Sequence, residues 1–485
     1  MTRPPTLVWF RRDLRLEDNA ALDAASGGGS PIIPVYIHSP AEEKPWEPGA
    51  ASCWWLHHSL ERLDASLRKR HSRLVIRKGG SLRELTRLIE ETGASAVYWN
   101  RLYEPALAAR DKQLEEQLRR RGIEVRTFPG HLLWEPSLIL NKQERPFQVF
   151  TPFWKHCSAI GDPPEPLPPP RLRLPERWPD GEALESLGLL PRIDWAGGLR
   201  EAWTPGEDGG RERLDAFARE TVRDYGETRN FPGTEGTSRL SPHLHFGEIT
   251  PRQVWHAVRP GGGKASGRGE AASAWSWLRQ IAWREFSHHL LHHFPHTPEE
   301  PLRENFRDFP WRRNSSRLKA WQQGRTGYPV VDAGMRELWA TGWMHNRVRM
   351  IVASFLVKHL LIPWQDGARW FWDTLVDADL ANNTMGWQWT AGCGADAAPF
   401  FRVFNPITQG EKFDPDGDYV RRWVPEIRLL PTTHLFKPWE APGHVLSEAD
   451  VHPGKNYPLP AVDHNEARTA ALLAFEEIKG RPSSR

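Results

Sequence analysis

The chain has 485 residues, of which 39% are hydrophobic and 26% are charged, and its formal net charge is +3. These values are typical of a soluble globular protein with room for two domains, and so small a charge neither indicates nor excludes a nucleic-acid partner. The three cysteines lie far apart, which argues against a disulfide framework. No apolar run could cross a bilayer and the N-terminus lacks a signal core, so we expect a cytoplasmic protein without a membrane partner.

Short β-rich runs alternate with amphipathic helices from residue 6 to about residue 130. The expected strands are Leu7–Phe10, Ile32–Ile37, Leu74–Arg77, Ala96–Asn100 and Val125–Phe128. The expected helices are Ala51–His71, Ser81–Thr92 and Pro105–Arg121. This order predicts an α/β domain over residues 1–135 with a parallel, Rossmann-like sheet. Gly27–Gly29 precedes the second strand instead of following the first, so we interpret it as a surface turn and not as a dinucleotide fingerprint.

The rest of the chain divides into a linker and a helical region. Residues 136–212 are predicted to be an interdomain linker, because the part from about residue 161, which begins GDPPEPLPPPRLRLP, is rich in proline and glycine and lacks sustained periodicity. From residue 213 to residue 485 we expect an all-α domain. Helical apolar spacing occurs in Arg211–Tyr225, Trp275–Phe294, Tyr328–Thr341 and Trp343–Leu361. The glycine-rich run Gly261–Glu270 is interpreted as a loop and not as a phosphate cradle.

The most informative stretch is DADLANNTMGWQWTAGCGADAAPFFRVFNP, residues 377–406. Asp377 and Asp379 can accept hydroxyl and amine donors from one ligand, Asn383 adds a neutral amide, and the two tryptophans add polarisable rings. This mixture suits a flavin better than a phosphate.

A second stretch, YGETRNFPGTEGTSRLS over residues 225–241, combines glycines, hydroxyls and arginines. Its exposed amides and side chains could hold a pyrophosphate. Taken alone, it is also explained as a helix start capped by Thr237 or Ser238.

Both stretches resemble the flavin-binding part of the DNA photolyase and cryptochrome family, and similar matches recur across nearly the whole chain. The resemblance is strongest to bacterial cyclobutane pyrimidine dimer photolyases. It implies that the all-α domain binds FAD, which is reduced in the active state. The cofactor contacts that it implies are Tyr225, Thr237, Ser238, Arg239, Leu240, Ser241, Trp277, Arg284, Asn346, Arg349, Asp377, Asp379 and Asn383.

The resemblance gives three of these residues a specific role. Arg349, paired with Asp377, would stabilise negative charge on the reduced ring, because a guanidinium stays ionised. Asn383 matches the position that faces flavin N5, where an amide can hydrogen-bond without adding charge. Plant cryptochromes usually carry aspartate at this position. The alternative for Asn383 is a helix-end cap.

Trp387, Trp364 and Trp311 match the three tryptophans that in this family pass an electron from the protein surface to photoexcited flavin. Taken singly, each is better explained as core packing. The family also binds an antenna pigment on the N-terminal domain, either methenyltetrahydrofolate or 8-hydroxy-deazaflavin. Glu104 stands where folate-binding relatives carry a carboxylate, so we favour the folate, although Glu104 could equally cap the helix that begins at Pro105.

The resemblance implies that the partner is UV-damaged DNA. A pyrimidine dimer reaches a flavin only if it is flipped out of the duplex into a pocket of aromatic and polar groups. Trp283 and Trp389 match the residues that cradle the dimer, with Asn346 and Met350 on its other side. Enzymes that repair the 6-4 lesion typically carry histidines at these last two positions, which favours cyclobutane dimers.

Gln280 departs from the pattern of cyclobutane dimer photolyases, many of which carry glutamate there. Glutamine can donate an N–H to a thymine carbonyl but cannot supply a proton, so we predict slower repair, not none. The alternative is that residue 280 lies at the hydrated rim of the pocket, where its identity is free to vary. Arg229 and Arg402 are candidate phosphate contacts, and for each a solvated surface position is an equal alternative.

The run SHHLLHHFPH places His288 and His292, and also His289 and His293, four residues apart, as in some helical metal sites. The run offers no third ligand, so we expect a polar helix face and no metal.

Together these resemblances predict a deoxyribodipyrimidine photo-lyase, a carbon–carbon lyase driven by blue light. In this family photoexcited reduced FAD passes an electron to the flipped-out dimer. The alternatives are a cryptochrome-type photoreceptor and a 6-4 photolyase, the latter supported mainly by Gln280. Only RPSSR follows the last family-like segment, so we expect no long signalling tail, no obligate protein partner and a monomer.

Overall fold

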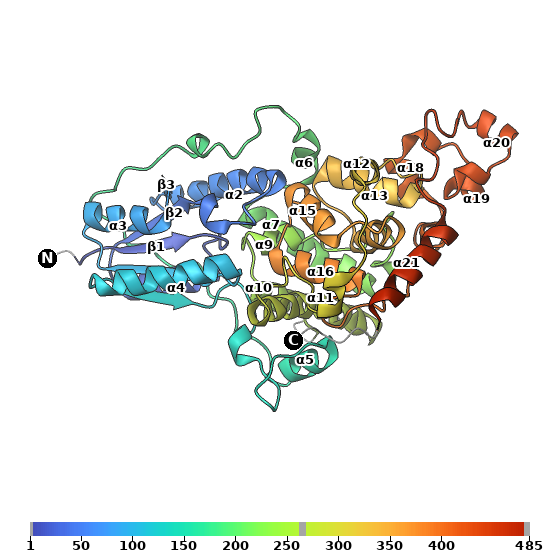
Figure 1. Cartoon of the computed structure of the whole chain (residues 1–485). Coiled ribbons are helices and arrows are strands. Elements are labelled where there is room, and N and C mark those ends of the chain that lie inside the picture. Colours follow the sequence, from blue (N-terminus) through green and yellow to red (C-terminus); the bar gives the residue numbers. More distant parts are fainter. Residues whose placement is uncertain (1–2, 261–267, 480–485) are drawn as a thin grey trace. The chain divides into compact units, whose positions relative to one another are not determined.

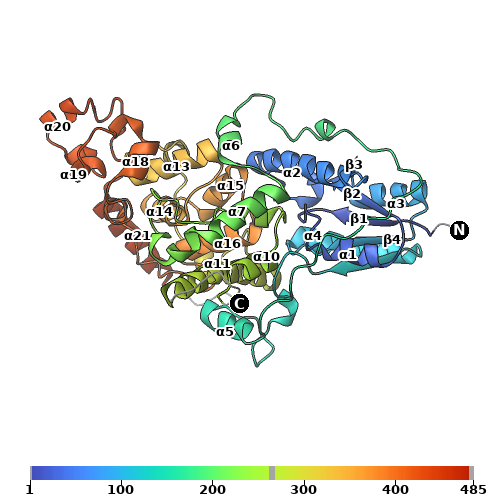
Figure 2. The same ribbon diagram turned by 180° about the vertical axis from the view of Figure 1, so that it is seen from behind.

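The computed structural model describes residues 3–260 and 268–479. Its N-terminal part contains five parallel strands in the order β3-β2-β1-β4-β5. They are β1 (Thr6–Phe10), β2 (Ile32–His38), β3 (Val75–Lys78), β4 (Ala96–Asn100) and β5 (Glu124–Phe128). The helices that flank this sheet are α1 (Ala20–Gly27), α2 (Ala50–Arg68), α3 (Ser81–Thr92) and α4 (Pro105–Arg120) (Figures 1 and 2). The predicted parallel α/β fold is confirmed, with one additional helix, α1, that the sequence analysis missed.

The centre of the sheet is apolar because parallel strands are covered on both faces. Leu7 of β1 lies opposite Ile33 of β2 and Val97 of β4 in the strand register. Trp9 and Trp99 belong to the same core and pack edge to face, with ring centroids 5.7 Å apart, and both are buried. The order of the strands reverses on the two sides of β1, as in doubly wound folds.

Most regular structure beyond the sheet is helical, as predicted, and can be followed from both sides in Figures 1 and 2. The first helices are α5 (Phe150–Ser158), α6 (Gly197–Ala202), α7 (Glu207–Arg219), α8 (Tyr225–Thr228), α9 (Ser241–His245), α10 (Pro251–Val258) and α11 (Arg268–His293). They are followed by α12 (Ser315–Gln322), α13 (Pro329–Thr341), α14 (Asn346–Ser354), α15 (Trp364–Thr374) and α16 (Leu380–Ala391). The last are α17 (Pro406–Phe413), α18 (Asp418–Trp423), α19 (Thr432–Leu435), α20 (Gly443–Glu448) and α21 (His464–Ile478).

Three segments differ from the sequence prediction. The segment assigned as a linker contains α5, α6 and the first turns of α7. The helix expected over Trp343–Leu361 begins only at Asn346, and after Ser354 it continues as a π-helical turn, Phe355–His359. Most of the predicted Gly261–Glu270 loop, like the RPSSR end, lies outside the described residues, but its last three residues belong to α11.

The chain forms two compact units that are discontinuous in sequence. Unit 1 contains Met1–Arg223, Ser238–Pro295 and Val376–Leu380, and unit 2 contains Asp224–Thr237, His296–Leu375 and Ala381–Arg485. The three-part division drawn from the sequence stays a prediction. Within residues 3–260 and 268–479, no helix combines the length and the apolar character that a membrane crossing needs.

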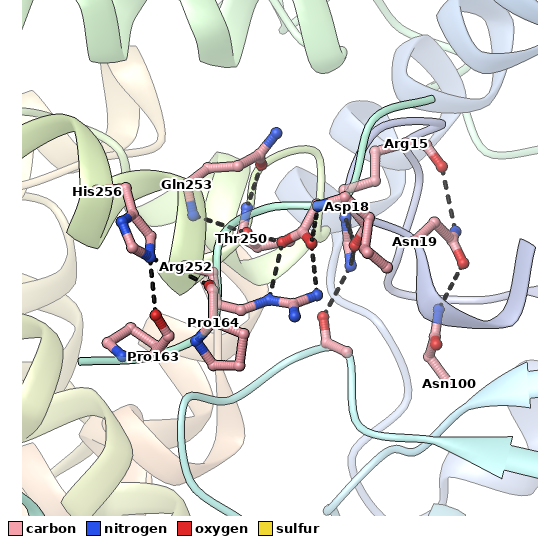
Figure 3. Close-up of polar contacts among 12 residues, drawn as sticks. Arg15, Asp18, Asn19, Asn100, Pro163, Pro164, Thr250, Arg252, Gln253 and His256 are labelled. Atoms are coloured by element: carbon pink, nitrogen blue, oxygen red, sulfur yellow. Dashed lines mark hydrogen bonds and ion pairs between the residues drawn. The ribbon is translucent and has the colours of Figure 1, made fainter. Parts of the chain in front are cut away.

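A buried polar junction explains why unit 1 extends beyond the sheet (Figure 3). Asp18, which follows β1 and is fully buried, accepts hydrogen bonds from Thr250 Oγ1 at 2.5 Å and from the Leu167 amide at 3.0 Å. Its carboxylate also pairs with the Arg252 guanidinium. Thr250 in addition caps α10 through a reciprocal capping box with Gln253. One carboxylate therefore ties the sheet to the proline-rich segment and to α10.

Candidate functional site

The residues predicted to contact the cofactor are divided between the two units. Those of unit 1 are Ser238, Arg239, Leu240, Ser241, Trp277, Arg284, Asp377 and Asp379. Those of unit 2 are Tyr225, Thr237, Asn346, Arg349 and Asn383. That the two sets form one flavin site, and that Arg349 pairs with Asp377, stay predictions.

The centre of the unit 1 set is Asp379, a carboxylate that is only 4% exposed. Its Oδ2 lies 3.6 Å from His245 Nδ1 and 3.4 Å from His288 Nε2. Burial by itself would raise the pKa of Asp379, but the charges and hydrogen bonds of His288 and His245 hold it well below its usual value. The site therefore presents an ionised acid inside the protein.

A third histidine, His131, extends this cluster. Its ring lies 5.5 Å from that of His288, and its Nε2 accepts a hydrogen bond of 2.7 Å from Arg284 Nη2. Burial and the Arg284 charge hold the pKa of His131 well below its usual value. Arg284 also donates to the His131 carbonyl at 2.9 Å and pairs with Glu285 at 3.3 Å. Arg284 is thus part of an internal polar network with charges of both signs.

His131, His288 and Asp379 bring three potential metal-ligand atoms within 4.8 Å of one another. This cluster was not recognised in the sequence, because its members are separated by more than 90 residues. Of the two pairs that the sequence did suggest, His288 and His292 are divided, since His288 is buried beside Asp379 whereas His292 is exposed. The rings of His289 and His293 do lie together, 4.6 Å apart. His289 bonds to the Phe147 amide at 3.0 Å.

The candidate phosphate loop has an irregular backbone between α8 and α9. Arg239 adopts a left-handed conformation with φ of 50°, and its guanidinium lies 4.7 Å from the Trp203 ring centroid. Helix α9 is preceded by Leu240 as its N-cap, without a side-chain capping bond. The alternative in which Thr237 or Ser238 caps this helix is therefore wrong. An irregular loop with hydroxyls and arginines fits a pyrophosphate, because its amides are not all used in a helix.

Asn383 lies inside α16, so the alternative of a helix-end cap is wrong as well. Its Nδ2 donates a 3.0 Å hydrogen bond to the Ala368 carbonyl of α15. This bond fixes the plane of the amide. Its predicted contact with flavin N5 stays a prediction.

The three matched tryptophans all belong to unit 2 and differ in burial. Trp387 and Trp364 are buried, whereas Trp311 is partly exposed and lies 4.3 Å from the Phe309 ring. Gly367 is required beside Trp387, because a Cβ there would fall 2.1 Å from the indole. The trio therefore combines two buried rings with one partly exposed ring. A path that leads electrons from the protein surface to a buried cofactor needs such a combination.

On the substrate side, Trp283 is half-buried and stacks face to face on Phe150, with centroids 3.6 Å apart and planes 7° from parallel. The Phe150 ring was not recognised in the sequence and holds the indole from one side. Gln280 donates its amide back to the Ser276 carbonyl at 3.1 Å. In unit 1, the candidate lesion-binding site therefore consists of Trp283 and Gln280, supported by Phe150 and Ser276.

In unit 2, Asn346 and Arg402 are exposed, and Trp389 and Arg229 are partly exposed. The Arg229 guanidinium lies 5.1 Å from the centroid of the buried Tyr225 ring. Met350 Sδ lies 4.0 Å from Asn346 Nδ2, so these two lesion-binding candidates are neighbours.

Glu104 is buried and forms an ion pair with Arg12, which also pairs with Glu43 at 2.8 Å. It precedes α4 but makes no side-chain capping bond, so the capping alternative is wrong. A pterin at Glu104 would have to share this carboxylate with Arg12. The antenna assignment stays a prediction.

Comparisons with known proteins give a consistent result. A family model described as the FAD binding domain of DNA photolyase matches residues 277–477, and one described as DNA photolyase matches residues 6–171. The chain is 52% identical to the deoxyribodipyrimidine photo-lyase of Agrobacterium fabrum over 98% of each protein. It is 42% identical to cryptochrome-1 of Arabidopsis thaliana, over 98% of this chain and 70% of that protein.

Solved structures agree with this result. The crystal structure of a bacterial class III photolyase from Agrobacterium tumefaciens matches with a TM-score of 0.95 and 51% identity, covering 99% of each chain. The cryptochrome of Synechocystis matches with a TM-score of 0.87 at 30% identity, over 98% of this chain and 100% of that one. The chain therefore belongs to the DNA photolyase family.

Proposed function

We propose that this protein is a light-driven deoxyribodipyrimidine photo-lyase that splits cyclobutane pyrimidine dimers in damaged DNA. The observation that carries the proposal is the 52% identity, over nearly the full length of both chains, to a protein of that name. Bound FAD, in its reduced form, would supply the electron under blue light, a chemistry that no side chain offers.

The residues of unit 1 would hold the cofactor through the ionised Asp379 and through the irregular loop around Arg239. An ionised carboxylate accepts hydroxyl or imide N–H donors, and loop amides with an arginine bind phosphates. In unit 2, Asn383 would add an amide with a fixed plane, because it is already anchored to Ala368. Arg349 would add positive charge, which favours an anionic ring.

The lesion would be held outside the duplex on aromatic rings. The Trp283–Phe150 stack offers a flat indole that is already fixed in orientation, so less side-chain freedom is lost when a base stacks on it. Trp389, Asn346 and Met350 would complete the pocket. Arg229 and Arg402 would contact the DNA phosphates.

The trio Trp387, Trp364 and Trp311 would pass electrons from a reductant at the protein surface to the cofactor and so restore its reduced form. Glu104 would contribute to an antenna site for methenyltetrahydrofolate or 8-hydroxy-deazaflavin. We further propose a cytoplasmic location. We also propose that the protein is a monomer, since no residue of the proposed site requires a second copy.

The test uses an oligonucleotide with one thymine dimer, mixed with the photoreduced protein in blue light or in darkness, and chromatography measures the restored thymines. We expect restoration only in the light. The matched control carries a 6-4 lesion in the same sequence and should stay unrepaired. A protein that holds reduced FAD but restores no dimer would contradict the proposal.

A second candidate is a blue-light photoreceptor, and the 42% identity to cryptochrome-1 favours it. Asn383 argues against it, because an amide cannot protonate a flavin radical as a carboxylic acid can. A lasting neutral radical spectrum after illumination, without repair, would favour the photoreceptor.

A further inference from the structure

The buried pair of Asp379 and His288 has a protonation state that its geometry defines. His288 Nδ1 lies 3.0 Å from the Arg284 carbonyl oxygen, one turn earlier in α11. A carbonyl oxygen is only an acceptor, so Nδ1 must carry a hydrogen. In a neutral imidazole the other nitrogen, Nε2, would then have only a lone pair.

Nε2 is the nitrogen that faces Asp379, at 3.4 Å from Oδ2. Two lone pairs facing each other at this distance would repel inside a buried site. The contact is attractive only if one proton lies between them, either on the imidazole or on the acid. The second histidine, His245, also approaches Oδ2, at 3.6 Å, and favours the ionised acid. With two imidazoles on one carboxylate oxygen, the geometry favours the ionised acid and the proton on His288.

The charges around the pair are otherwise compensated. Arg284 pairs with Glu285 at 3.3 Å and donates to His131, and Glu285 in turn accepts the Leu133 amide at 2.7 Å. The cluster thus places two pairs of opposite charge side by side, Arg284 with Glu285 and His288 with Asp379. A metal ion is disfavoured here, because the Arg284 guanidinium is bonded to His131 Nε2.

We propose that His288 is a positioning residue for the flavin, whose imidazolium charge keeps the Asp379 carboxylate ionised and oriented. The inference rests on the proposed FAD site. His288 and Asp379 together are neutral, so the carboxylate can accept a flavin hydroxyl or imide N–H without adding net negative charge. That neutrality matters beside a ring that becomes anionic when it is reduced.

The experiment compares three variants of the full chain with bound FAD. His288→Gln keeps an N–H donor but removes the charge, His288→Arg restores a charge, and His292→Gln changes an exposed histidine one turn later in α11 as a control. FAD release on dilution, followed by flavin fluorescence, gives the dissociation constant. We expect it to rise by about tenfold in His288→Gln, because a neutral amide holds the Asp379 carboxylate less strongly than a charged imidazolium does. It should stay near the wild-type value in His292→Gln, and His288→Arg should recover part of the affinity that His288→Gln loses.

A second readout separates this role from simple packing. Nitrogen-15 NMR of histidine-labelled wild-type protein at neutral pH should show a buried, doubly protonated ring whose signal disappears in His288→Gln and shifts in Asp379→Asn. This measurement stands even if His288→Gln folds poorly.

The inference is overturned if His288→Gln keeps the wild-type FAD affinity, if His288→Arg releases FAD as readily as His288→Gln, or if the buried ring is neutral. Stoichiometric zinc in the purified protein, with FAD lost on chelation, would also overturn it. Failure of the proposed function is a different result, in which the wild-type protein holds FAD but repairs no dimer.

Discussion

Two buried aspartates in this protein are held in opposite ways. Asp379 in unit 1 faces two histidines, and its pKa is lowered. Asp332 in unit 2 accepts hydrogen bonds from the amides of Thr326 and Gly327, from Thr326 Oγ1 and from Tyr457 Oη, at 2.6 to 3.0 Å. Burial nevertheless raises the pKa of Asp332, because these donors compensate for desolvation only in part. Neutral donors suit a structural role, whereas a charged partner keeps an acid ionised for binding.

The first prediction tests the structural role of Asp332. In Asp332→Ala the four donors lose their acceptor, and each buried unsatisfied donor is costly. We expect the free energy of unfolding to fall by about 4 kcal/mol. Urea denaturation measures it, with Asp416→Ala, an exposed aspartate of unit 2, as the control. A loss below about 1 kcal/mol would show that water replaces the carboxylate.

The second prediction concerns Asp379→Asn, which keeps the shape but removes the charge. We expect FAD affinity to fall by about tenfold or more, while unfolding in urea changes less than in Asp332→Ala. Flavin fluorescence on dilution measures the affinity. If Asp379→Asn instead destabilises the chain as strongly as Asp332→Ala and leaves FAD binding unchanged, the two aspartates do not differ in role.

A third prediction follows from the opposite pKa directions. A lowered pKa contributes stability that is present above the unfolded value of about 3.9 and is lost as the pH falls through the folded value. A raised pKa contributes stability that is present below the unfolded value and is lost as the pH rises through the folded value.

Consequently, acidification below about pH 4 should cost the wild type stability relative to Asp379→Asn. Acidification from neutral pH towards about pH 4 should instead favour the wild type relative to Asp332→Asn. Urea denaturation over a pH series measures both differences. Slopes of the same sign would contradict the contrast.

The sheet could be predicted from the sequence because strand signals are local. Each expected strand agrees with the observed one within about one residue, since the apolar runs are short and are bounded by turn residues. Helix α1 was missed, because AALDAASG has too few large apolar residues to show helical periodicity. The π-helical turn at Phe355–His359 was missed for another reason, since its apolar spacing continues that of α14.

The candidate site could be predicted only in part. Asp379 stands in a stretch whose composition itself suggests a ligand, whereas His131, His245 and His288 come from three separate segments. Only folding brings their rings to one carboxylate, so spacing along the chain could not indicate them. The stacking of Phe150 on Trp283 could not be predicted either, because α5 lies in the segment that was assigned to the linker.

The smallest expected effect concerns Gln280, where an amide stands in place of an acid. Its Nε2 donates to the Ser276 carbonyl, so the amide is anchored within α11. Gln280→Glu would remove this donor and add a group that can supply a proton, and we expect a modest rise in the quantum yield of dimer repair. The yield is measured by counting restored thymines per absorbed photon, with Gln280→Met as the control that offers neither a proton nor a hydrogen-bond donor. An unchanged yield in Gln280→Glu would mean that an acid at this position donates no proton during repair. The difference between an acid and an amide would then matter for FAD binding at Asp379 but not for repair at the lesion.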